Sequence, residues 1–254
     1  MTLLAVDGLR LRFGGIIALD GVGFTVAEGE IRGLIGPNGA GKTSLFNCLS
    51  RIYRPDEGSI TFAGRDLLAL GPHRIAAAGI GRTFQNLALF PNMTVRQNVM
   101  VGAHATAHCG FLRGALRPRA VRLEEAEMAA RADELLDFVR LAHLADTPVG
   151  ALPFGFQKRV ETARALACRP RLLLLDEPAA GLNHDELGEF EALVRQIRDR
   201  LGVAVLLIEH HLKLVMALCD RIVALDFGAR IAEGTPDEIR RDPAVIKAYL
   251  GAAA

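Results

Sequence analysis

The sequence has no apolar run approaching the roughly 20 residues of a membrane-spanning helix, and neither sign of charge is in strong excess. We therefore expect a soluble chain that reaches any membrane through a partner. The formal net charge of +1 gives no global basis for binding nucleic acid. The chain opens Met1-Thr2-Leu3-Leu4 and meets Asp7 almost at once, so no signal peptide is expected.

Cysteine is sparse, and there is neither an internal repeat nor a low-complexity segment. Cysteines without a CxxC pair are typical of reduced thiols in the cytosol. His104 and His108 are spaced to share a helix face beside Cys109, but no third ligand set follows, so we discount a metal there. A length of 254 residues, 50% of them apolar, predicts one domain, or one large lobe with a smaller insert. The four cysteines lie far apart, at Cys48, Cys109, Cys168 and Cys219.

A glycine-rich stretch lies between a predicted buried strand, Ile31–Ile35, and a predicted helix, Ser44–Ser50. Glycines let the backbone curl so that successive N–H groups point at an anion, and the helix N-terminus adds its positive end. This is the pattern of a phosphate-binding loop, in which Lys42 binds the β- and γ-phosphates and Thr43 offers a hydroxyl to Mg²⁺. A tight turn with a solvated lysine fits poorly, because every fixed position matches. The loop runs Gly36, Pro37, Asn38, Gly39, Ala40, Gly41, Lys42, Thr43.

Two carboxylates follow a second apolar strand, Leu172–Leu175. An apolar strand that ends in acid is the Mg²⁺-holding partner of a phosphate loop. We expect Asp176 to hold the metal through its water shell and Glu177 to polarise the attacking water. The alternative, an acidic surface turn, is disfavoured by the four preceding leucines.

Three further strand ends carry candidate residues. Phe13 offers a flat surface for a nucleotide base, or it is an ordinary core or edge phenylalanine. Gln85 ends the predicted strand Gly79–Phe84, where its amide can reach a metal-bound or attacking water, although a solvated glutamine is the simpler interpretation. His210 follows the predicted strand Val203–Ile208 and can donate and accept near a terminal phosphate. The alternative for His210 is a purely structural histidine.

Residues 86–150 interrupt the alternation of strands and helices. We expect helices at Asn98–His108 and Leu123–Leu144, separated by an arginine-rich loop from Gly110 to Arg122. That loop faces a membrane or a partner, or it is simply solvated, which is the favoured interpretation. The block predicts a helical insert in an α/β core, and a further helix is expected at Lys158–Cys168.

The order of these motifs resembles the ATP-binding subunit of ABC transporters from Leu3 to Gly251. The resemblance implies an α/β fold: a P-loop core with a mixed, mainly parallel sheet and an antiparallel β subdomain, plus a helical insert. It divides one domain, 1–254, into a core lobe of residues 1–85 and 151–254 and an insert of residues 86–150, with the signature helix at 152–168. Within the family the chain resembles the larger ATPase subunit of the branched-chain amino-acid importer branch, on the segments Gly81–Gln85, Leu89–Val95, Ile208–His210, Gly234–Ile239 and Asp242–Gly251.

The resemblance also implies roles at matching positions. The residues that bind ATP are Phe13, Gly36, Pro37, Asn38, Gly39, Ala40, Gly41, Lys42, Thr43 and Ser44. The Mg²⁺ ligands are Thr43, Gln85 and Asp176, and the catalytic residues are Glu177, His210 and Gln85. The signature that contacts the partner subunit's ATP is Pro153, Phe154, Gly155, Phe156 and Gln157, and the D-loop is Ala180, Gly181, Leu182 and Asn183.

The family assembles as a head-to-tail dimer with two ATPs between the subunits. The resemblance therefore implies a second ATPase subunit, two membrane-spanning permease subunits and, indirectly, a periplasmic solute-binding protein, with the chain peripheral on the cytoplasmic face of the inner membrane. ATP closes the dimer, hydrolysis opens it, and a groove beside Gln85 passes the movement to a membrane subunit.

The signature departs from the family pattern Leu-Ser-(Gly or aromatic)-Gly-Gln, because Pro153 replaces the serine and Phe156 the glutamine. Proline lacks the hydroxyl that reaches the opposite γ-phosphate, and losing such a hydrogen bond costs about 1.5–3 kcal/mol. A helix tolerates proline in its first turn, and Gly155 keeps its backbone donor. We therefore hypothesise a heterodimer whose second ATPase has an intact signature. Asn183 in place of the D-loop aspartate is a further departure.

No Asn-Lys-x-Asp run is present, so ATP is favoured over GTP. A non-transport ABC ATPase of DNA repair or translation would carry paired ATPase units, a long coiled coil or a basic face, none of which the sequence has. A regulator that binds ATP without hydrolysing it is disfavoured by the presence of Glu177 and His210. The expected function is powering uptake of branched-chain or other hydrophobic amino acids, with urea, amides or lipopolysaccharide export as alternative cargoes.

Overall fold

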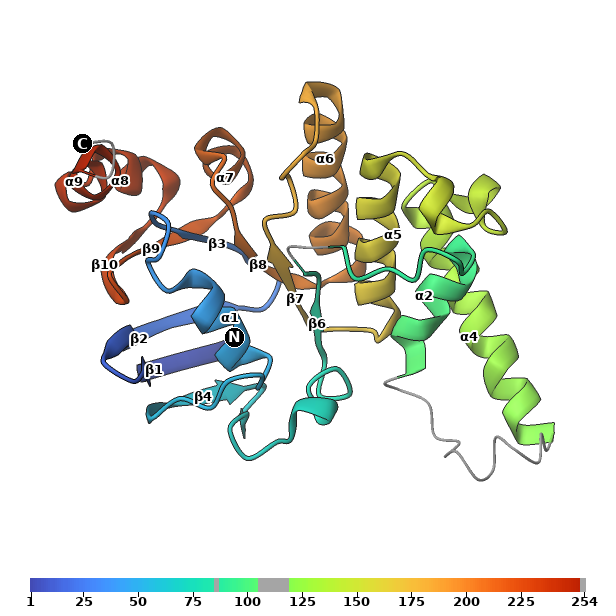
Figure 1. The fold of residues 1–254 in the computed structure, drawn as a ribbon, viewed down its shortest axis with the longest axis horizontal. Coiled ribbons are helices and arrows are strands. Elements are labelled where there is room, and N and C mark those ends of the chain that lie inside the picture. The colour runs from blue at the N-terminus through green and yellow to red at the C-terminus, as the bar shows by residue number, and fades with distance from the viewer. Residues whose placement is uncertain (85–86, 105–118, 252–254) are drawn as a thin grey trace.

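The computed structural model describes residues 1–84, 87–104 and 119–251 and consists of two sheets with helices between and above them (Figure 1). The central sheet has the order β10–β9–β3–β8–β7–β6, and its neighbouring strands are parallel except for β9 and β10. Its strands are β3 (Ile31–Ile35), β6 (Ile80–Arg82), β7 (Leu172–Asp176), β8 (Ala204–Ile208), β9 (Arg221–Asp226) and β10 (Ala229–Gly234).

The second sheet is wholly antiparallel, with the order β2–β1–β4–β5. Its strands are β1 (Thr2–Phe13), β2 (Ile16–Ala27), β4 (Glu57–Phe62) and β5 (Arg65–Asp66). Figure 1 shows helix α1 (Lys42–Leu49) between this sheet and the central one. A mixed, mainly parallel sheet beside an antiparallel one is the predicted α/β architecture.

The other helices of the described residues lie over the opposite side of the central sheet and beyond its β6 edge (Figure 1). They are α2 (Val95–Ala103), α4 (Arg119–Phe138), α5 (Phe154–Ala167), α6 (His184–Leu201), α7 (Leu212–Leu218), α8 (Pro236–Arg241) and α9 (Pro243–Gly251). Within the described ranges, short 3₁₀ helices occur at Pro72–Arg74, Ala142–Leu144 and Val149–Ala151. Helix α5 packs on both α2 and α4, so the helical layer continues past residue 150.

The central sheet separates two hydrophobic cores. Side chains of a strand alternate between its faces, and in β7 Leu173 and Leu175 belong to the core under the helices, whereas Leu172 and Leu174 belong to the core shared with α1 and the antiparallel sheet. A strand buried on both faces is nearly all apolar, which explains the run of four leucines before Asp176.

The structure corrects the expected ends of the helices within the insert. Helix α4 begins at Arg119, inside the loop predicted to reach Arg122, and ends at Phe138 rather than Leu144. Arg140 has a φ of +61°, a left-handed conformation that ends the helix. Helix α2 begins at Val95, three residues earlier than predicted, behind a Thr94 capping box.

The rest of the predicted arginine loop, residues 110–118, lies outside the described residues, as do His108 and Cys109 of the discounted metal cluster. In the part of the chain that the structure describes, every helix is too short or too polar to span a bilayer.

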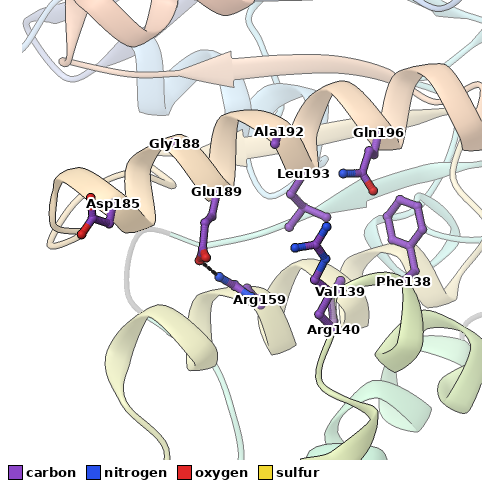
Figure 2. A pocket seen from close by; sticks show the side chains of 10 residues that line it. All are labelled: Phe138, Val139, Arg140, Arg159, Asp185, Gly188, Glu189, Ala192, Leu193 and Gln196. Carbon is purple, nitrogen blue, oxygen red and sulfur yellow. Dashed lines mark hydrogen bonds and ion pairs between the residues drawn. The ribbon is translucent and has the colours of Figure 1, made fainter.

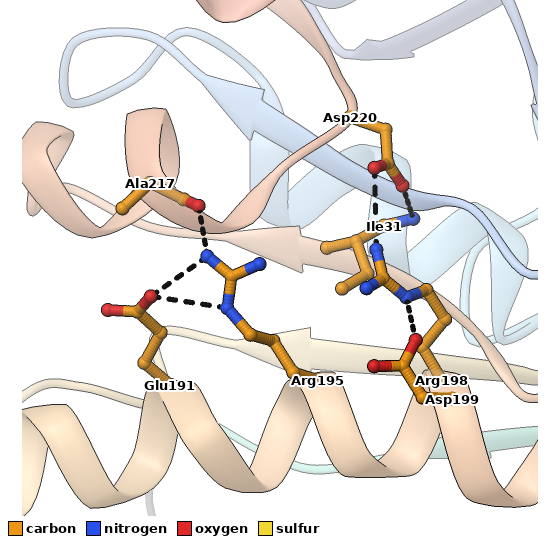
Figure 3. A network of polar contacts seen from close by, with 7 residues as sticks. All are labelled: Ile31, Glu191, Arg195, Arg198, Asp199, Ala217 and Asp220. Atoms are coloured by element: carbon orange, nitrogen blue, oxygen red, sulfur yellow. Dashed lines mark hydrogen bonds and ion pairs between the residues drawn. The ribbon is translucent and has the colours of Figure 1, made fainter.

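Helix α6 is anchored to the sheet by a polar network (Figure 3). Arg195 donates to the carbonyl of Ala217 at the end of α7. Arg198 lies 3.4 Å from Asp220, whose other carboxylate oxygen accepts a 2.8 Å hydrogen bond from the backbone N–H of Ile31. Helix α6 is thereby tied to the first residue of β3, the strand that leads into the glycine-rich loop.

Helices α5 and α6 are also linked to each other. Figure 2 shows Arg159 of α5 directed at Glu189 of α6, with which it forms an ion pair. The pair lies beside a pocket of about 400 Å³ whose other walls include residues 138–140, at the end of α4. The helix that carries the signature segment is therefore connected to the helix that follows the D-loop.

Candidate nucleotide-binding site

The loop between β3 and α1 requires glycine at two positions. Gly36 has a φ of +151°, and a Cβ atom there would lie 2.2 Å from the carbonyl oxygen of Leu225. Gly41 has a φ of +97°, and its Cβ atom would lie 2.4 Å from the carbonyl oxygen of Ala18. Both conformations and both contacts exclude larger residues. The surrounding strands therefore fix the curl of the loop.

Lys42, the first residue of α1, is 6% exposed. Its Nζ donates to the carbonyl oxygens of Gly36 and Pro37, at 2.7 and 2.8 Å. Burial lowers the pKa of Lys42, while the charges of Glu177 and Asp176 oppose the shift by raising it. The lysine thus lies on its own loop and near both predicted acids. Thr43 is exposed and Ser44 is half-buried at the start of the same helix.

The predicted base and the predicted histidine are in contact. Oε1 of Glu177 lies 2.7 Å from Nε2 of His210. Glu177 follows β7 with a φ of +49°, a left-handed conformation that costs a non-glycine residue free energy, and its N–H donates to Ile208 at the end of β8. Adjacent strand ends therefore bring together residues 33 positions apart.

Asp176, the last residue of β7, is 2% exposed. Its Oδ2 accepts a 3.0 Å hydrogen bond from Arg82, whereas its Oδ1 is buried with no hydrogen-bond partner. Burial raises the pKa of Asp176, and the Arg82 guanidinium opposes that shift.

The unpaired Oδ1 of Asp176 fits a magnesium ligand, because a buried carboxylate oxygen without a partner is costly and Mg²⁺ prefers oxygen. The described residues contain no group of three or more His, Cys, Asp or Glu side chains that could hold a metal by themselves. Mg²⁺ in a nucleotide site needs none, since one or two carboxylates, substrate phosphates and water complete its shell.

Arg82 is a site residue that the sequence analysis missed. It ends β6, and besides Asp176 it donates to the side chains of Asn47 and Ser50 on and just after α1, at 2.9 and 2.8 Å. Its guanidinium also lies 5.1 Å from the ring centroid of Phe84. A single charged residue in a short buried strand was the available signal. Arg82 connects the helix of the phosphate loop to the carboxylate opposite it.

Glu209 is a second missed residue. It is 3% exposed, and one of its oxygens accepts a 2.7 Å hydrogen bond from the N–H of Ala179. The other accepts from the N–H groups of His210 and His211, at 3.0 and 3.3 Å. Glu209 therefore joins the turn after Glu177 to the backbone that carries the histidine.

Phe13 is 45% exposed at the end of β1, and its ring meets Tyr53 edge-on at 5.1 Å. The exposed ring is therefore accessible to a nucleotide base, and Phe13 is not a core residue. Gln85 lies outside the described residues. Just before it, the N–H of Phe84 donates 3.1 Å to the buried carboxylate of Glu161 on α5, a contact that no sequence pattern indicates.

The signature segment begins α5. Pro153 is the N-cap residue, so α5 starts at Phe154 rather than at residue 152, and the proline makes no side-chain capping hydrogen bond. Gln157 donates 2.8 Å to the carbonyl of Leu152, and the guanidinium of Arg159 lies 5.5 Å from the ring of Phe156. Proline at this position therefore leaves α5 without the side-chain cap that a serine would provide.

The D-loop lies against the signature segment of the same chain. A Cβ atom on Gly181 would lie 2.9 Å from the ring of Phe154, and one on Gly155 would lie 2.3 Å from Glu186. Asn183 caps α6 by accepting from the N–H groups of residues 185 and 186, at 3.0 Å each. Its departure from aspartate is therefore compatible with a capping role. Ala180 donates to the carbonyl of residue 177, at 3.2 Å, and Leu182 is half-buried.

Comparison with known proteins gives concordant matches. The profile of the ABC transporter family matches residues 19–180, and a profile described as a branched-chain amino acid ATP-binding cassette transporter matches residues 229–254. The chain is 46% identical over 251 residues to the high-affinity branched-chain amino acid transport ATP-binding protein BraF of Pseudomonas aeruginosa, covering 99% of this chain and 98% of that protein.

A second relative, the high-affinity branched-chain amino acid transport ATP-binding protein LivG of Salmonella typhimurium, is 45% identical with the same coverage. Among solved structures, the ADP conformation of the ATP-binding cassette MJ1267 matches with a TM-score of 0.86 and 32% identity, over 99% of both chains.

A phosphate loop and two strand-end carboxylates at one edge of a mainly parallel sheet define the class of P-loop nucleoside triphosphatases. Within that class, the chain belongs to the ABC transporter family of ATP-binding proteins. The resemblance inferred from the sequence, including its branched-chain branch, is confirmed, as are the α/β P-loop fold and the assignment as an ABC-type ATPase.

Proposed function

We propose that the chain hydrolyses ATP to power uptake of branched-chain amino acids through membrane subunits. The observation that carries the proposal is the 2.7 Å contact between Glu177 and His210 at the sheet edge that also holds the phosphate loop and Asp176. Two relatives that match nearly the whole chain are named for this transport.

In this proposal the adenine base lies on the exposed face of Phe13, and the backbone amides of residues 36–44 bind the phosphates. Lys42 leaves the loop carbonyls and bonds the β- and γ-phosphates. Thr43, Gln85 and Asp176 would hold Mg²⁺, which would supply positive charge against the negative charge that develops during hydrolysis.

Glu177 then accepts a proton from the attacking water, and His210 keeps that carboxylate oriented toward the γ-phosphate. The residues around the pair support this assignment. Glu209 fixes the backbone on both sides of the contact, so the pair is held before a nucleotide arrives, and positioning of this kind lowers the barrier without new binding energy.

The second part of the proposal is an asymmetric dimer. This chain carries the phosphate loop, both acids and the histidine of its own site, whereas the signature that it lends to its neighbour has Pro153 and Phe156 in place of the polar residues. A partner ATPase with an intact signature makes this chain's own site the efficient one. The D-loop, Ala180–Asn183, lies between the two sites, in contact with the signature segment.

The third part of the proposal is peripheral attachment to the cytoplasmic face of the inner membrane. A largely apolar groove of about 490 Å³ runs between β6 and helices α2 and α5, lined by residues that include Ile75, Phe84, Phe90 and Val101. We assign it to one of two membrane-spanning permease subunits, which receive the amino acid from a periplasmic binding protein. Exposed apolar grooves are typical of such contacts.

Glu177→Gln tests the function. Cells that lack the gene, complemented with this variant, should take up labelled leucine at less than about one hundredth of the wild-type rate, because the water is no longer deprotonated. ATP binding should persist, since the loop is unchanged. Glu125→Gln, an exposed position on α4, should transport normally. Wild-type uptake by Glu177→Gln cells would rule out the proposal.

The asymmetry has its own test in the reconstituted transporter. Glu177→Gln in this chain should reduce ATP turnover more than the equivalent change in the partner subunit. Equal loss from both changes, or greater loss from the partner's, would show that the two sites are not divided as proposed.

A further inference from the structure

The C-terminal helix α9 reaches the phosphate loop. The phenol oxygen of Tyr249 accepts a 2.9 Å hydrogen bond from the backbone N–H of Gly36, the first glycine of the loop. The two residues are 213 positions apart. Tyr249 lies in the segment 229–254 that matches the branched-chain family profile, well outside the match to the general ABC profile.

Both backbone polar groups of Gly36 make hydrogen bonds. Its N–H is bound by Tyr249, and its carbonyl accepts the 2.7 Å hydrogen bond from Nζ of Lys42. Its φ of +151° and the 2.2 Å approach of its missing Cβ to Leu225 leave it no alternative side chain. A continuous chain of hydrogen bonds therefore runs from α9 through Gly36 to the lysine that binds phosphate.

Helix α9 is itself well fixed. Asp242 caps its start by accepting from the N–H groups of Ala244 and Val245, at 2.8 and 3.2 Å, and Val245 is 6% exposed in the helical core. Elsewhere α9 stands off from the loop, because a pocket of about 480 Å³ lies between Ala244 and Lys247 on the helix and residues 37–40. Tyr249, which follows Ala248 of the pocket wall, bonds the loop directly.

We propose that Tyr249 is a positioning residue for the phosphate loop: through Gly36 it holds the loop in the conformation that receives nucleotide, and so sets the affinity of the site for ATP and ADP alike. Tyr249 does not touch the reacting atoms. A buried amide that loses its acceptor must find another or move, and in this loop movement of Gly36 also displaces the carbonyl that holds Lys42. Burial raises the pKa of Tyr249, which keeps the phenol neutral.

Tyr249→Phe tests the proposal, because it removes the oxygen and keeps the ring. A fluorescent ATP or ADP analogue titrated into the full chain should bind about two- to tenfold more weakly, the range set by one neutral hydrogen bond. In the assembled transporter KM for ATP should rise by the same factor with kcat unchanged, since the lost interaction serves ground state and transition state equally. Amide exchange at Gly36 should accelerate.

Ile246→Ala, an exposed position on the same helix, is the matched control and should leave affinity and exchange unchanged. Wild-type nucleotide affinity in Tyr249→Phe would overturn the proposal, and so would an equal loss in Ile246→Ala or a fall in kcat without a rise in KM. Lys42→Ala is measured alongside. If it weakens binding while Tyr249→Phe does not, only this inference fails; if Lys42→Ala also binds normally, the nucleotide site itself is misassigned.

Discussion

Asp176 is a buried carboxylate whose ion-pair partner comes from a strand 94 residues away in the chain. Arg82 and Asp176 are both less than a tenth exposed, and Arg82 also donates to the side chains of Asn47 on α1 and Ser50 just after it. In such a pair the charges were desolvated together, so removing one leaves the other uncompensated. The pair therefore has consequences for stability as well as for the site.

Arg82→Ala is expected to lower the free energy of unfolding by about 3–5 kcal/mol, the cost of breaking a buried pair. Urea denaturation measures it. Arg240→Ala removes an ion pair whose partners are 64% and 77% exposed, and this control should cost less than about 1 kcal/mol. Equal losses from the two changes would mean that the Arg82 pair contributes no more than a surface contact.

Glu161 offers a pH-dependent test at the same scale. Burial raises its pKa above the usual 4.5, against the opposing hydrogen bond from Phe84. A carboxyl whose pKa is raised in the folded state binds its proton more tightly there than in the unfolded chain. Its contribution to stability is fully present below pH 4.5 and is lost as the pH rises through the folded value.

Glu161→Gln removes this titration and keeps an oxygen acceptor for Phe84. The unfolding free energy of the variant minus that of the wild type should therefore increase as the pH is raised from 4.5 toward neutrality. Denaturant melts at a series of pH values measure the difference. A difference that does not change with pH would contradict the raised pKa.

At the scale of elements, the close crossing of α2 and α5 depends on one glycine. A Cβ atom on Gly102 would lie 2.0 Å from the carbonyl oxygen of Arg164, a backbone atom that cannot move aside. Gly188 on α6 is the opposite case, because a Cβ atom there would meet nothing within 4 Å. Replacing each glycine by alanine therefore separates the effect of the steric clash on stability from the effect of helix propensity.

Gly102→Ala should lower the free energy of unfolding by about 1–3 kcal/mol, because α2 and α5 must move apart. Gly188→Ala should raise it by about 0.5–1 kcal/mol, because alanine is the better helix former. Thermal and urea melts of both variants measure the two signs. A stabilised Gly102→Ala variant would show that the two helices can separate without cost.

The elements also show why some of the site was predictable and the rest was not. The phosphate loop and the acids after β7 are short contiguous patterns, in which local sequence specifies a turn and a strand end. Arg82, Glu209 and Tyr249 act through partners distant in the chain, and which strands become neighbours is decided by the packing of the whole sheet. The end of α4 at Phe138 was not predicted, because apolar periodicity continues past it. The helix stops where Arg140 adopts a left-handed backbone conformation, which the apolar pattern does not indicate.

At the scale of the whole molecule, nucleotide binding should increase the free energy of unfolding. A ligand that binds only the folded chain adds about 2.7 kcal/mol at one hundred times its Kd. For a chain of this size, that predicts a rise in Tm of about 5–10 °C with saturating Mg-ATP. Lys42→Ala should abolish the rise, whereas Lys213→Ala, exposed on α7, should keep it. A full shift in Lys42→Ala would contradict the assignment of the loop.

The central sheet lies between two hydrophobic cores, and this arrangement affects how the molecule unfolds locally. Leu173 and Leu175 pack in the core under the helices, and Leu172 and Leu174 pack in the core on the opposite face. Either core can therefore open locally while β7 keeps its hydrogen bonds to the neighbouring strands. Native-state hydrogen exchange should then resolve two foldons that share one set of slowly exchanging strand amides. In such a chain the helices can move during a transport cycle while the central sheet, whose edge carries the nucleotide site, keeps its structure.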